Sequence, residues 1–315
     1  MTNLFSTHGG KLDAVVRQYG GKKSEWLDLS TGINPKPYPF KQIDKTYWNR
    51  LPDDNDFKSL YTAARNFWSP PKSSLLLGAP GVSSLIALIP LLQPFKTVSI
   101  QNPTYSEYEL SFKRVGCKVL DIGGEINVVV NPNNPDGKIQ IRDEILKNHK
   151  KLTIIDESFC DLYPENSLVS LAVNPDIIIL KSFGKFWGLA GLRLGFAIGT
   201  GSTINPIKDA LGPWQISGPA FSIGCQALKD TKWAEGTRVD LNKSARRLDL
   251  IMDGYKLVGG TNLYRLYYTK DAQNLTQHLA SQKILIRNFD YNKNWVRIGI
   301  PGQESDWERL YKAVK

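Results

Sequence analysis

The sequence predicts an α/β fold built on a mostly parallel sheet, followed by a smaller α+β domain. Between about residues 75 and 200, short apolar runs alternate with helical patterns, which is typical of a parallel sheet with helices on both faces. Polar or glycine-rich stretches directly follow several of these runs, as ligand-binding loops follow the strands of open α/β sheets. From about Thr231 the pattern changes to a long charged helix and two further strands.

These patterns divide the chain into three regions. A glycine- and proline-rich N-terminal segment (residues 1–40) precedes a large domain (41–230) and a small C-terminal domain (231–315). The strands expected in the large domain are Leu75–Leu77, Thr97–Ile100, Lys118–Ile122, Ile126–Val130, Leu152–Ile155, Ile177–Leu180 and Leu194–Ile198. In the small domain we expect a helix over Glu235–Met252 and strands near Leu263–Tyr268 and Val296–Ile300.

Composition excludes several classes of protein. With 41% hydrophobic and 22% charged residues, the chain resembles an ordinary soluble globular protein. It has no apolar run of the ~20 residues that a membrane span needs, and MTNLFSTHGGKLD lacks the apolar core of a signal peptide. The 3 cysteines form no CxxC motif, which argues against a disulfide framework or a zinc site. We therefore expect a cytoplasmic location. The net charge of +10 is spread along the chain, so we expect a solvated surface and no nucleic-acid partner.

The segment Lys181–Gly195 contains the strongest candidate for a reactive group, Lys185. An apolar stretch ending at Leu180 runs into this segment, so Lys185 would lie at the carboxyl end of a strand. Apolar neighbours disfavour a charged lysine, which lowers its pKa and frees the amine to attack a carbonyl. Ser182 and Arg193 lie on either side and could bind a phosphate. The segment therefore predicts a covalent anchor for a phosphorylated aldehyde, against the alternative of an ordinary solvated lysine.

Two polar turns follow other predicted strands. Gly78–Ser84 is a glycine turn that opens a helix, and the free N–H groups of such a turn can bind a phosphate. An ordinary turn between a strand and a helix is the alternative. The second turn, NPNNPDG at residues 131–137, is restricted by two Asn-Pro steps and a glycine. We expect it to hold Asn134 rigidly enough to donate a hydrogen bond to a ligand.

Two charged residues lie at the end of, or inside, apolar strands. Asp156 ends the strand LTII and could pair with a cationic ring nitrogen, although a metal ligand or a helix cap would give the same pattern. Arg297 lies within WVRIG, where a buried guanidinium needs a partner. A bidentate substrate carboxylate and a structural ion pair are both consistent with this position.

A phosphate site, an acid for a ring cation, a reactive lysine and a carboxylate-binding arginine together predict pyridoxal phosphate acting on an amino acid. The order and spacing of Asp156, Lys185 and Arg193, with NPNNPDG upstream, resemble the fold-type I aminotransferases, most closely those of the histidinol-phosphate type. Six blocks between His8 and about Gly302 are similar to the threonine-phosphate decarboxylase branch of cobalamin biosynthesis. These blocks are HGGKLDAVVRQYG, WLDLSTGINPKPYP, RLPD, SFGKFWGLAGLRLG, GPWQISGP and VRIGIPG.

The resemblance implies a seven-stranded fold-type I sheet and a role for each matching residue. Lys185 would hold the cofactor covalently, Asp156 would keep its ring nitrogen protonated, and Tyr105 would stack on the ring; these three are the implied catalytic residues. Asn134 would donate to the ring oxygen, and Arg297 would bind the substrate carboxylate. The implied phosphate ligands are Gly81, Val82, Ser83, Ser182 and Arg193. The N-terminal segment would close over the substrate through His8, Ser30, Gly32 and Asn34.

The activity implied by the resemblance is decarboxylation of L-threonine O-3-phosphate to (R)-1-aminopropan-2-yl phosphate by a homodimer without a metal. An aminotransferase of the histidinol-phosphate type is the alternative, and a non-catalytic regulator that binds pyridoxal phosphate is a more distant one. The chain departs from the common pattern at Phe159 and Leu51, where many relatives have tyrosines that contact the cofactor. Without the first tyrosine, we expect the lysine–cofactor linkage to keep its proton to a higher pH.

Overall fold

The computed structural model describes residues 8–92 and 94–315, and these form two compact units. The large unit comprises Pro37–Ala234. The small unit combines the chain up to Lys36 with Glu235–Lys315, so the N-terminal segment belongs to the same unit as the C-terminal region. The boundary falls within the long helix α9 (Thr231–Ile251).

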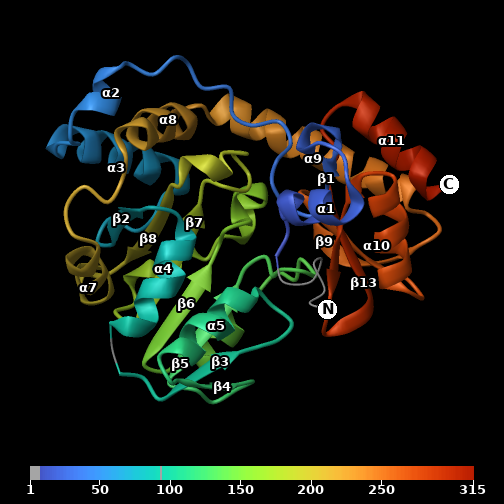
Figure 1. The fold of residues 1–315 in the computed structure, drawn as a ribbon. Coiled ribbons are helices and arrows are strands. Elements are labelled where there is room, and N and C mark those ends of the chain that lie inside the picture. Colours follow the sequence, from blue (N-terminus) through green and yellow to red (C-terminus); the bar gives the residue numbers. More distant parts are fainter. Residues whose placement is uncertain (1–7, 93) are drawn as a thin grey trace. The chain divides into compact units, whose positions relative to one another are not determined.

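A seven-stranded sheet forms the centre of the large unit, with the strand order β2-β8-β7-β6-β5-β3-β4 (Figure 1). β8 runs antiparallel to both of its neighbours, and the other neighbouring pairs are parallel. The predicted mostly parallel sheet is therefore confirmed. Its strands are β2 (Leu75–Ala79), β3 (Thr97–Ile100), β4 (Lys118–Leu120), β5 (Ile126–Val130), β6 (Leu152–Asp156), β7 (Ile177–Ser182) and β8 (Gly195–Gly199).

The strand directions gather the candidate residues at one edge of this sheet. β6 and β7 end at Asp156 and Ser182, beyond the predicted ends of these strands. Because β8 is antiparallel, it begins where its neighbours end, and Arg193 lies just before it. β2 is antiparallel to β8 and so runs with the other strands, which places the turn at Gly81 at the same edge.

Helices cover both faces of this sheet. The core on one face joins alternate strand residues, such as Leu77 and Ala79, to α4, α5 and α7, two of which are seen in front of the sheet in Figure 1. The intervening residues face the other side, where Gly78 approaches Ile216 and the ring of Phe196 lies 5.0 Å from that of Trp68 in α3. The helices of the large unit are α2 (Thr46–Asn49), α3 (Asp54–Trp68), α4 (Val82–Leu88), α5 (Ser106–Arg114), α6 (Arg142–Asn148), α7 (Gly201–Leu211) and α8 (Gly218–Lys229).

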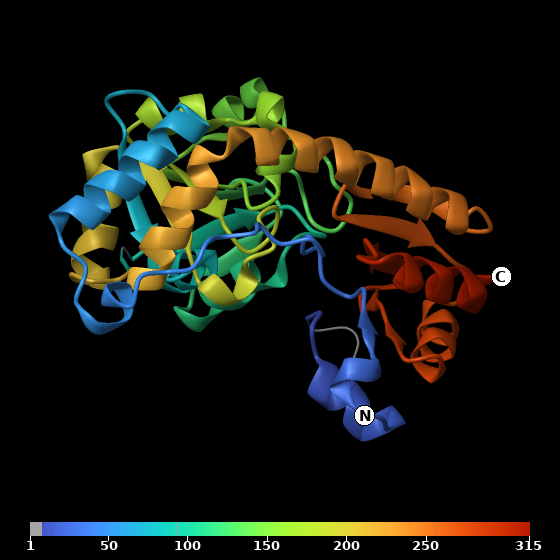
Figure 2. The same ribbon diagram turned by 90° about the horizontal axis from the view of Figure 1, so that it is seen from above.

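The small unit is an α+β structure with its own core. An antiparallel sheet in the order β12-β13-β10-β9 packs against α9, α10 and α11, and β1 pairs in parallel with β11 (Figure 2). The elements of the small unit besides α9 are α1 (Leu12–Tyr19), β1 (Leu27–Asp28), β9 (Lys256–Thr261), β10 (Tyr264–Tyr268), α10 (Ala272–Ser281), β11 (Ile284–Leu285), β12 (Arg287–Phe289), β13 (Asn292–Gly299) and α11 (Glu304–Val314).

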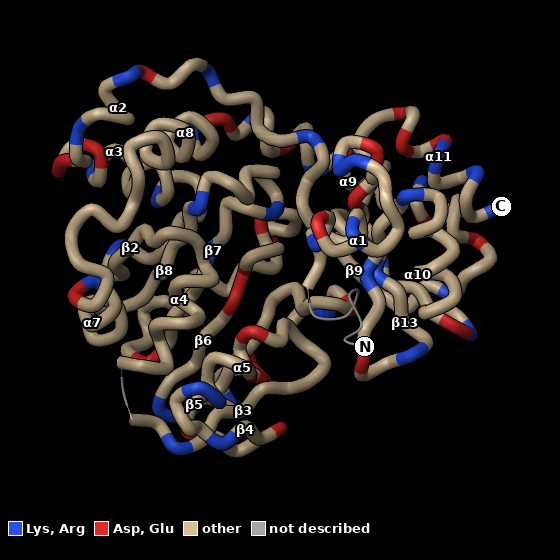
Figure 3. The backbone as a smooth tube through the Cα atoms, viewed as in Figure 1, with Lys and Arg blue, Asp and Glu red and all other residues tan. Residues whose placement is uncertain are grey.

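Charged residues of both signs are interspersed along both units (Figure 3). Within residues 8–92 and 94–315, no helix is both long and apolar enough to cross a membrane. The same residues contain no group of three histidine, cysteine, aspartate or glutamate side chains that could hold a metal ion.

Candidate active site

Asp156 is a buried carboxylate at the end of β6, with a relative exposure of 3%. Tyr108 donates its hydroxyl proton to Oδ2 over 2.8 Å, and the backbone N–H of Ser158 donates to Oδ1, also over 2.8 Å. Burial raises the pKa of Asp156, although these hydrogen bonds and the positive charge of Lys185 act in the opposite direction. A cation bound beside Asp156 would therefore relieve an unfavourable buried charge.

Lys185 lies in the segment that connects β7 and β8, and its charge acts on Asp156. Its Nζ atom is 5.6 Å from the centre of the Phe159 ring. The residue that differs from the common tyrosine is thus a direct neighbour of the lysine. The structure brings together the acid and the amine that the sequence placed 29 residues apart.

Tyr105 and the turn at residues 131–137 lie near Asp156. The ring of Tyr105 meets that of Tyr108 edge to face, with 6.4 Å between the ring centres. Asn133 connects the turn to the Tyr105 segment, because it accepts from the Thr104 hydroxyl over 2.7 Å and donates to the Pro103 carbonyl over 3.0 Å. Asn134 is half-buried at the next position.

The predicted phosphate site contains a narrow space between Gly81 and Arg193. Gly81 has φ +84°, and a Cβ atom at this position would lie 2.7 Å from Nη2 of Arg193. Position 195 also has no room for a side chain, because a Cβ atom added to Gly195 would lie 2.7 Å from the backbone nitrogen of Val82. Val82 and Ser83 begin α4, and the Ser182 hydroxyl accepts from the N–H of Gly184 over 3.2 Å. Backbone N–H groups, a hydroxyl and a guanidinium suit a phosphate, and with the buried Asp156 they fit pyridoxal phosphate.

Gly81→Ala is expected to weaken cofactor binding by tenfold or more. The left-handed backbone costs a non-glycine residue about 1–2 kcal/mol, and the added methyl would displace the Arg193 guanidinium. Titration of the cofactor-free protein with pyridoxal phosphate, followed by absorbance, measures the change. Gly191→Ala is the control, because its Cβ would meet no atom within 4 Å. Equal affinities of the two variants would contradict a phosphate site at Gly81.

In the small unit, a hydrogen bond connects Arg297 to Ser30. Arg297 is buried in β13, and its Nη2 donates to the Ser30 carbonyl over 2.8 Å. The Ser30 hydroxyl donates to Asp28 over 2.5 Å and accepts from the N–H of Gly10 over 2.7 Å. Gly9, the neighbour of His8, lies so close to Ser30 that its Cβ would be 2.4 Å from the Ser30 carbonyl oxygen.

The remaining predicted substrate residues lie in the same unit. Gly32 and Asn34 are both buried, and Asn34 accepts from the backbone N–H of Lys36 over 3.0 Å through its side-chain oxygen. The structure therefore joins Ser30 and Arg297 by a hydrogen bond and places His8, through its neighbour Gly9, in the same N-terminal stretch as Ser30, Gly32 and Asn34.

A second arginine, Arg287, lies beside Arg297 and was not predicted from the sequence. Arg287 lies on β12 directly opposite Arg297, with its guanidinium 5.3 Å from the centre of the Phe289 ring. Two like charges at facing positions of a sheet repel each other, and a bound anion would reduce this repulsion. The signal that could have revealed this arginine is the apolar run ILI that precedes it, which indicates a half-buried strand.

A buried cluster of charged residues next to the site was not predicted from the sequence either. Lys181, Glu157 and Asp161 are each at most 4% exposed. The Nζ atom of Lys181 lies 2.5 Å from Oε2 of Glu157 and 3.9 Å from Oδ1 of Asp161. The signal was present in the sequence, since Glu157 follows the last residue of β6, Asp156, and Lys181 follows the apolar run IIIL of β7.

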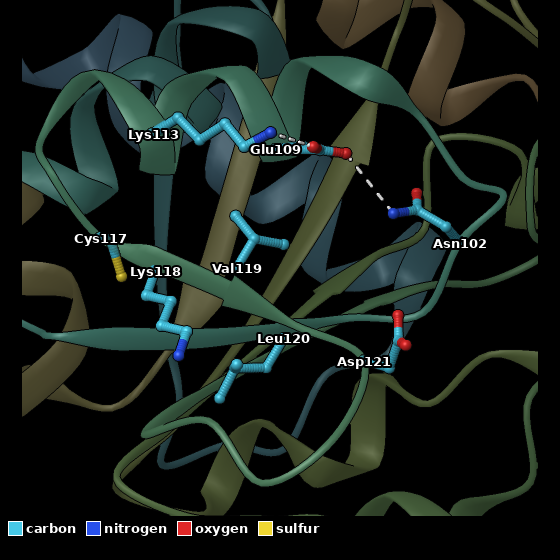
Figure 4. A pocket seen from close by; sticks show the side chains of 8 residues that line it. All are labelled: Asn102, Glu109, Lys113, Cys117, Lys118, Val119, Leu120 and Asp121. Carbon is cyan, nitrogen blue, oxygen red and sulfur yellow. Dashed lines mark hydrogen bonds and ion pairs between the residues drawn. The ribbon is translucent and has the colours of Figure 1, made fainter. Parts of the chain in front are cut away.

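A hollow of about 580 Å³ lies elsewhere, between α5 and β4 (Figure 4). In its wall, Lys113 donates to Glu109 over 2.5 Å, and Glu109 accepts from Asn102 over 3.4 Å. None of the predicted site residues lines this hollow. Its lysines and acids already neutralise one another in part, so we do not assign it to the active site.

The sheet topology, with an acid, a lysine and the predicted phosphate site at one edge, is that of the fold-type I class of pyridoxal-phosphate enzymes. A sequence model of the family "Aminotransferase class I and II" matches residues 121–314. The chain belongs to this family. It is 36% identical to a threonine-phosphate decarboxylase from Sinorhizobium sp., over 98% of this chain and 97% of that protein. It is 33% identical to a threonine-phosphate decarboxylase from Pseudomonas aeruginosa, over 98% and 96%.

A solved structure has the same fold. Histidinol-phosphate aminotransferase from Sinorhizobium meliloti, in complex with pyridoxal-5'-phosphate, superposes with a TM-score of 0.83 at 18% identity. The match covers 100% of this chain and 96% of that one.

Proposed function

We propose that the protein is a pyridoxal-phosphate-dependent decarboxylase that converts L-threonine O-3-phosphate to (R)-1-aminopropan-2-yl phosphate and CO2 in cobalamin biosynthesis. The facing arginines Arg287 and Arg297 are the observation that carries the proposal, because such a pair suits a substrate with two anionic groups. Arg297 would bind the carboxylate and Arg287 the phosphate. The names of the two decarboxylases that share a third of their sequence with this chain support the same choice.

The protein's own residues would have separate tasks in this reaction. When bound, pyridoxal phosphate withdraws electrons from the bonds to the substrate's Cα. Asp156 would hold the positive charge on the ring nitrogen. Arg297 would bind and orient the substrate carboxylate, the group that leaves as CO2. Lys185 would then donate a proton to Cα.

The test is to incubate the purified enzyme with threonine phosphate and identify the products. Release of one CO2 per aminopropanol phosphate supports the proposal. An aminotransferase of the histidinol-phosphate type is the alternative, favoured by family membership and by the named structural neighbour. It would instead convert an amino acid to a keto acid, with 2-oxoglutarate needed for further turnover and no release of CO2.

Arg297→Lys is expected to raise the KM for threonine phosphate roughly 10- to 100-fold, because a lysine cannot form the two parallel hydrogen bonds to a carboxylate. Steady-state kinetics measure the change. Arg265→Lys is the control, since Arg265 lies on the adjacent strand β10 and is paired with Asp249 at 2.9 Å. A KM that changes equally in both variants would argue that Arg297 has a structural role.

We also propose that the protein is a homodimer located in the cytoplasm. Its partner would be the phosphorylated amino acid, and it would bind neither a nucleic acid nor a membrane. Large apolar side chains are exposed on the large unit, including Trp48 at 67%, Leu51 at 61% and Trp214 at 54%. Tyr47, beside Trp48, contacts the start of α8 at Gly218, four residues beyond Trp214. A second copy covering these residues would remove them from water. Sedimentation should show a dimer, and Trp48→Glu should weaken it.

A further inference from the structure

The buried cluster of Lys181, Glu157 and Asp161 contacts the chain on both sides of Lys185. Lys181 begins this segment and pairs with Glu157 and Asp161. Trp187 lies two residues beyond Lys185, and its Nε1 donates to Oδ2 of Asp161 over 3.1 Å. Its indole ring is fully buried and stacks on Phe183 and on Trp233, with 5.3 and 5.4 Å between ring centres.

The same cluster is fixed to the strand that carries Asp156. Glu157 follows Asp156 directly, and it accepts from the N–H of Leu168 over 2.5 Å and from the Ser167 hydroxyl over 2.7 Å. Asp161 also accepts from Nε1 of Trp68 over 2.8 Å. Burial disfavours the charged form of Lys181, but the two carboxylates outweigh it and raise its pKa. The cluster is therefore a charged, hydrogen-bonded unit with few alternative arrangements.

We propose that Lys181, Glu157, Asp161 and Trp187 are positioning residues that fix the amine of Lys185 relative to Asp156. The proposal rests on the proposed role of Lys185 as the cofactor anchor. A buried ion pair is weak evidence of added stability, because desolvation offsets much of its attraction. Holding a reactive amine within a fraction of an ångström, in contrast, has a large effect on rate, since a misplacement of about 1 Å can cost about 100-fold.

Two tryptophans that donate to Asp161 provide a matched pair of variants. Comparing them separates an effect on the position of Lys185 from an effect on the stability of the fold. Trp187→Phe and Trp68→Phe each remove one buried N–H donor to the same carboxylate. Trp187 belongs to the Lys185 segment, whereas Trp68 ends α3. The measurement is the rate at which pyridoxal phosphate attaches to the cofactor-free protein, followed by absorbance. In this step the Lys185 nitrogen bonds to the aldehyde carbon and water leaves. Urea unfolding of each variant gives its stability.

Trp187→Phe is expected to slow attachment about tenfold or more, whereas Trp68→Phe, which changes no residue of the Lys185 segment, should slow it clearly less. Equal rates in the two variants would overturn the proposal. The double variant Lys181→Met with Glu157→Gln removes one charge of each sign and should also slow attachment; an unchanged rate would likewise overturn it. If Lys185→Ala still formed the lysine-linked absorbance band, the anchor role itself would fail, which distinguishes the two failures.

Discussion

Replacing Lys185 with alanine is expected to remove the absorbance band of the covalently attached cofactor and to reduce decarboxylation by about 1,000- to 10,000-fold. Both the covalent link and the proton donor to Cα would be lost, and proton transfer by a positioned side chain contributes about 100- to 10,000-fold. A 1,000-fold loss corresponds to about 4 kcal/mol in the activation free energy. Absorbance spectra and single-turnover rates with threonine phosphate measure the two effects.

A surface lysine gives the control for this variant. Lys113 pairs with Glu109 on the exposed side of α5, so Lys113→Ala should keep both the band and the rate. Added methylamine should restore part of the activity of Lys185→Ala, because a free amine can take over the proton transfer. A variant that kept its band, or that lost activity through unfolding, would contradict the assignment of Lys185.

Asp156→Asn is expected to have opposite effects on activity and on stability. Activity should fall about 100- to 1,000-fold, because an amide cannot stabilise the positive charge on the cofactor ring. The cofactor-free variant, however, should be more stable than the wild type at neutral pH. Burial raises the pKa of Asp156 above its ordinary value of 3.8, so the folded protein is penalised for keeping this carboxylate charged.

The pH dependence follows from the direction of this shift. Between pH 3.8 and the raised pKa, the folded state binds more protons at Asp156 than the unfolded state does. Stability is therefore lost as the pH rises through this window and is constant above it. The stability advantage of the cofactor-free Asp156→Asn variant should grow over the same window in urea titrations. An advantage that shrank with rising pH would show that Asp156 has a lowered pKa instead.

The features that could best be predicted from the sequence are those that depend on a short run of consecutive residues. Apolar runs identified the strands of the large unit. Asp156 was chosen as a candidate because it directly follows one such run, and Lys185 because its segment follows another run that ends at Leu180. Strand direction was harder to predict, since the reversal of β8 depends on pairing with Ile179 and Leu76 rather than on its own residues. Parallel and antiparallel buried strands have similar apolar composition.

Contacts between distant residues could not be predicted. Tyr108 donates to Asp156 across 48 residues of sequence, and Arg287 faces Arg297 only because a hairpin sets their register. Lys181 is buried next to Glu157, which lies 24 residues earlier in the sequence. The environment of such a side chain depends on residues that are far away in the sequence. A single sequence does not show which distant residues come into contact.

The connection between β7 and β8 has a consequence for how this enzyme can change. Ser182 and Gly195 face each other across the two strands, and Phe183 donates its N–H to the Leu194 carbonyl over 3.1 Å. Residues 183–194 thus form a loop with a closed base, and lengthening such a loop costs only about 0.6 kcal/mol per doubling. Substitutions or insertions near Gly191 could alter the spacing of Lys185 and Arg193 while the sheet remains intact. Reaction specificity can therefore diverge in this family without a matching loss of foldability.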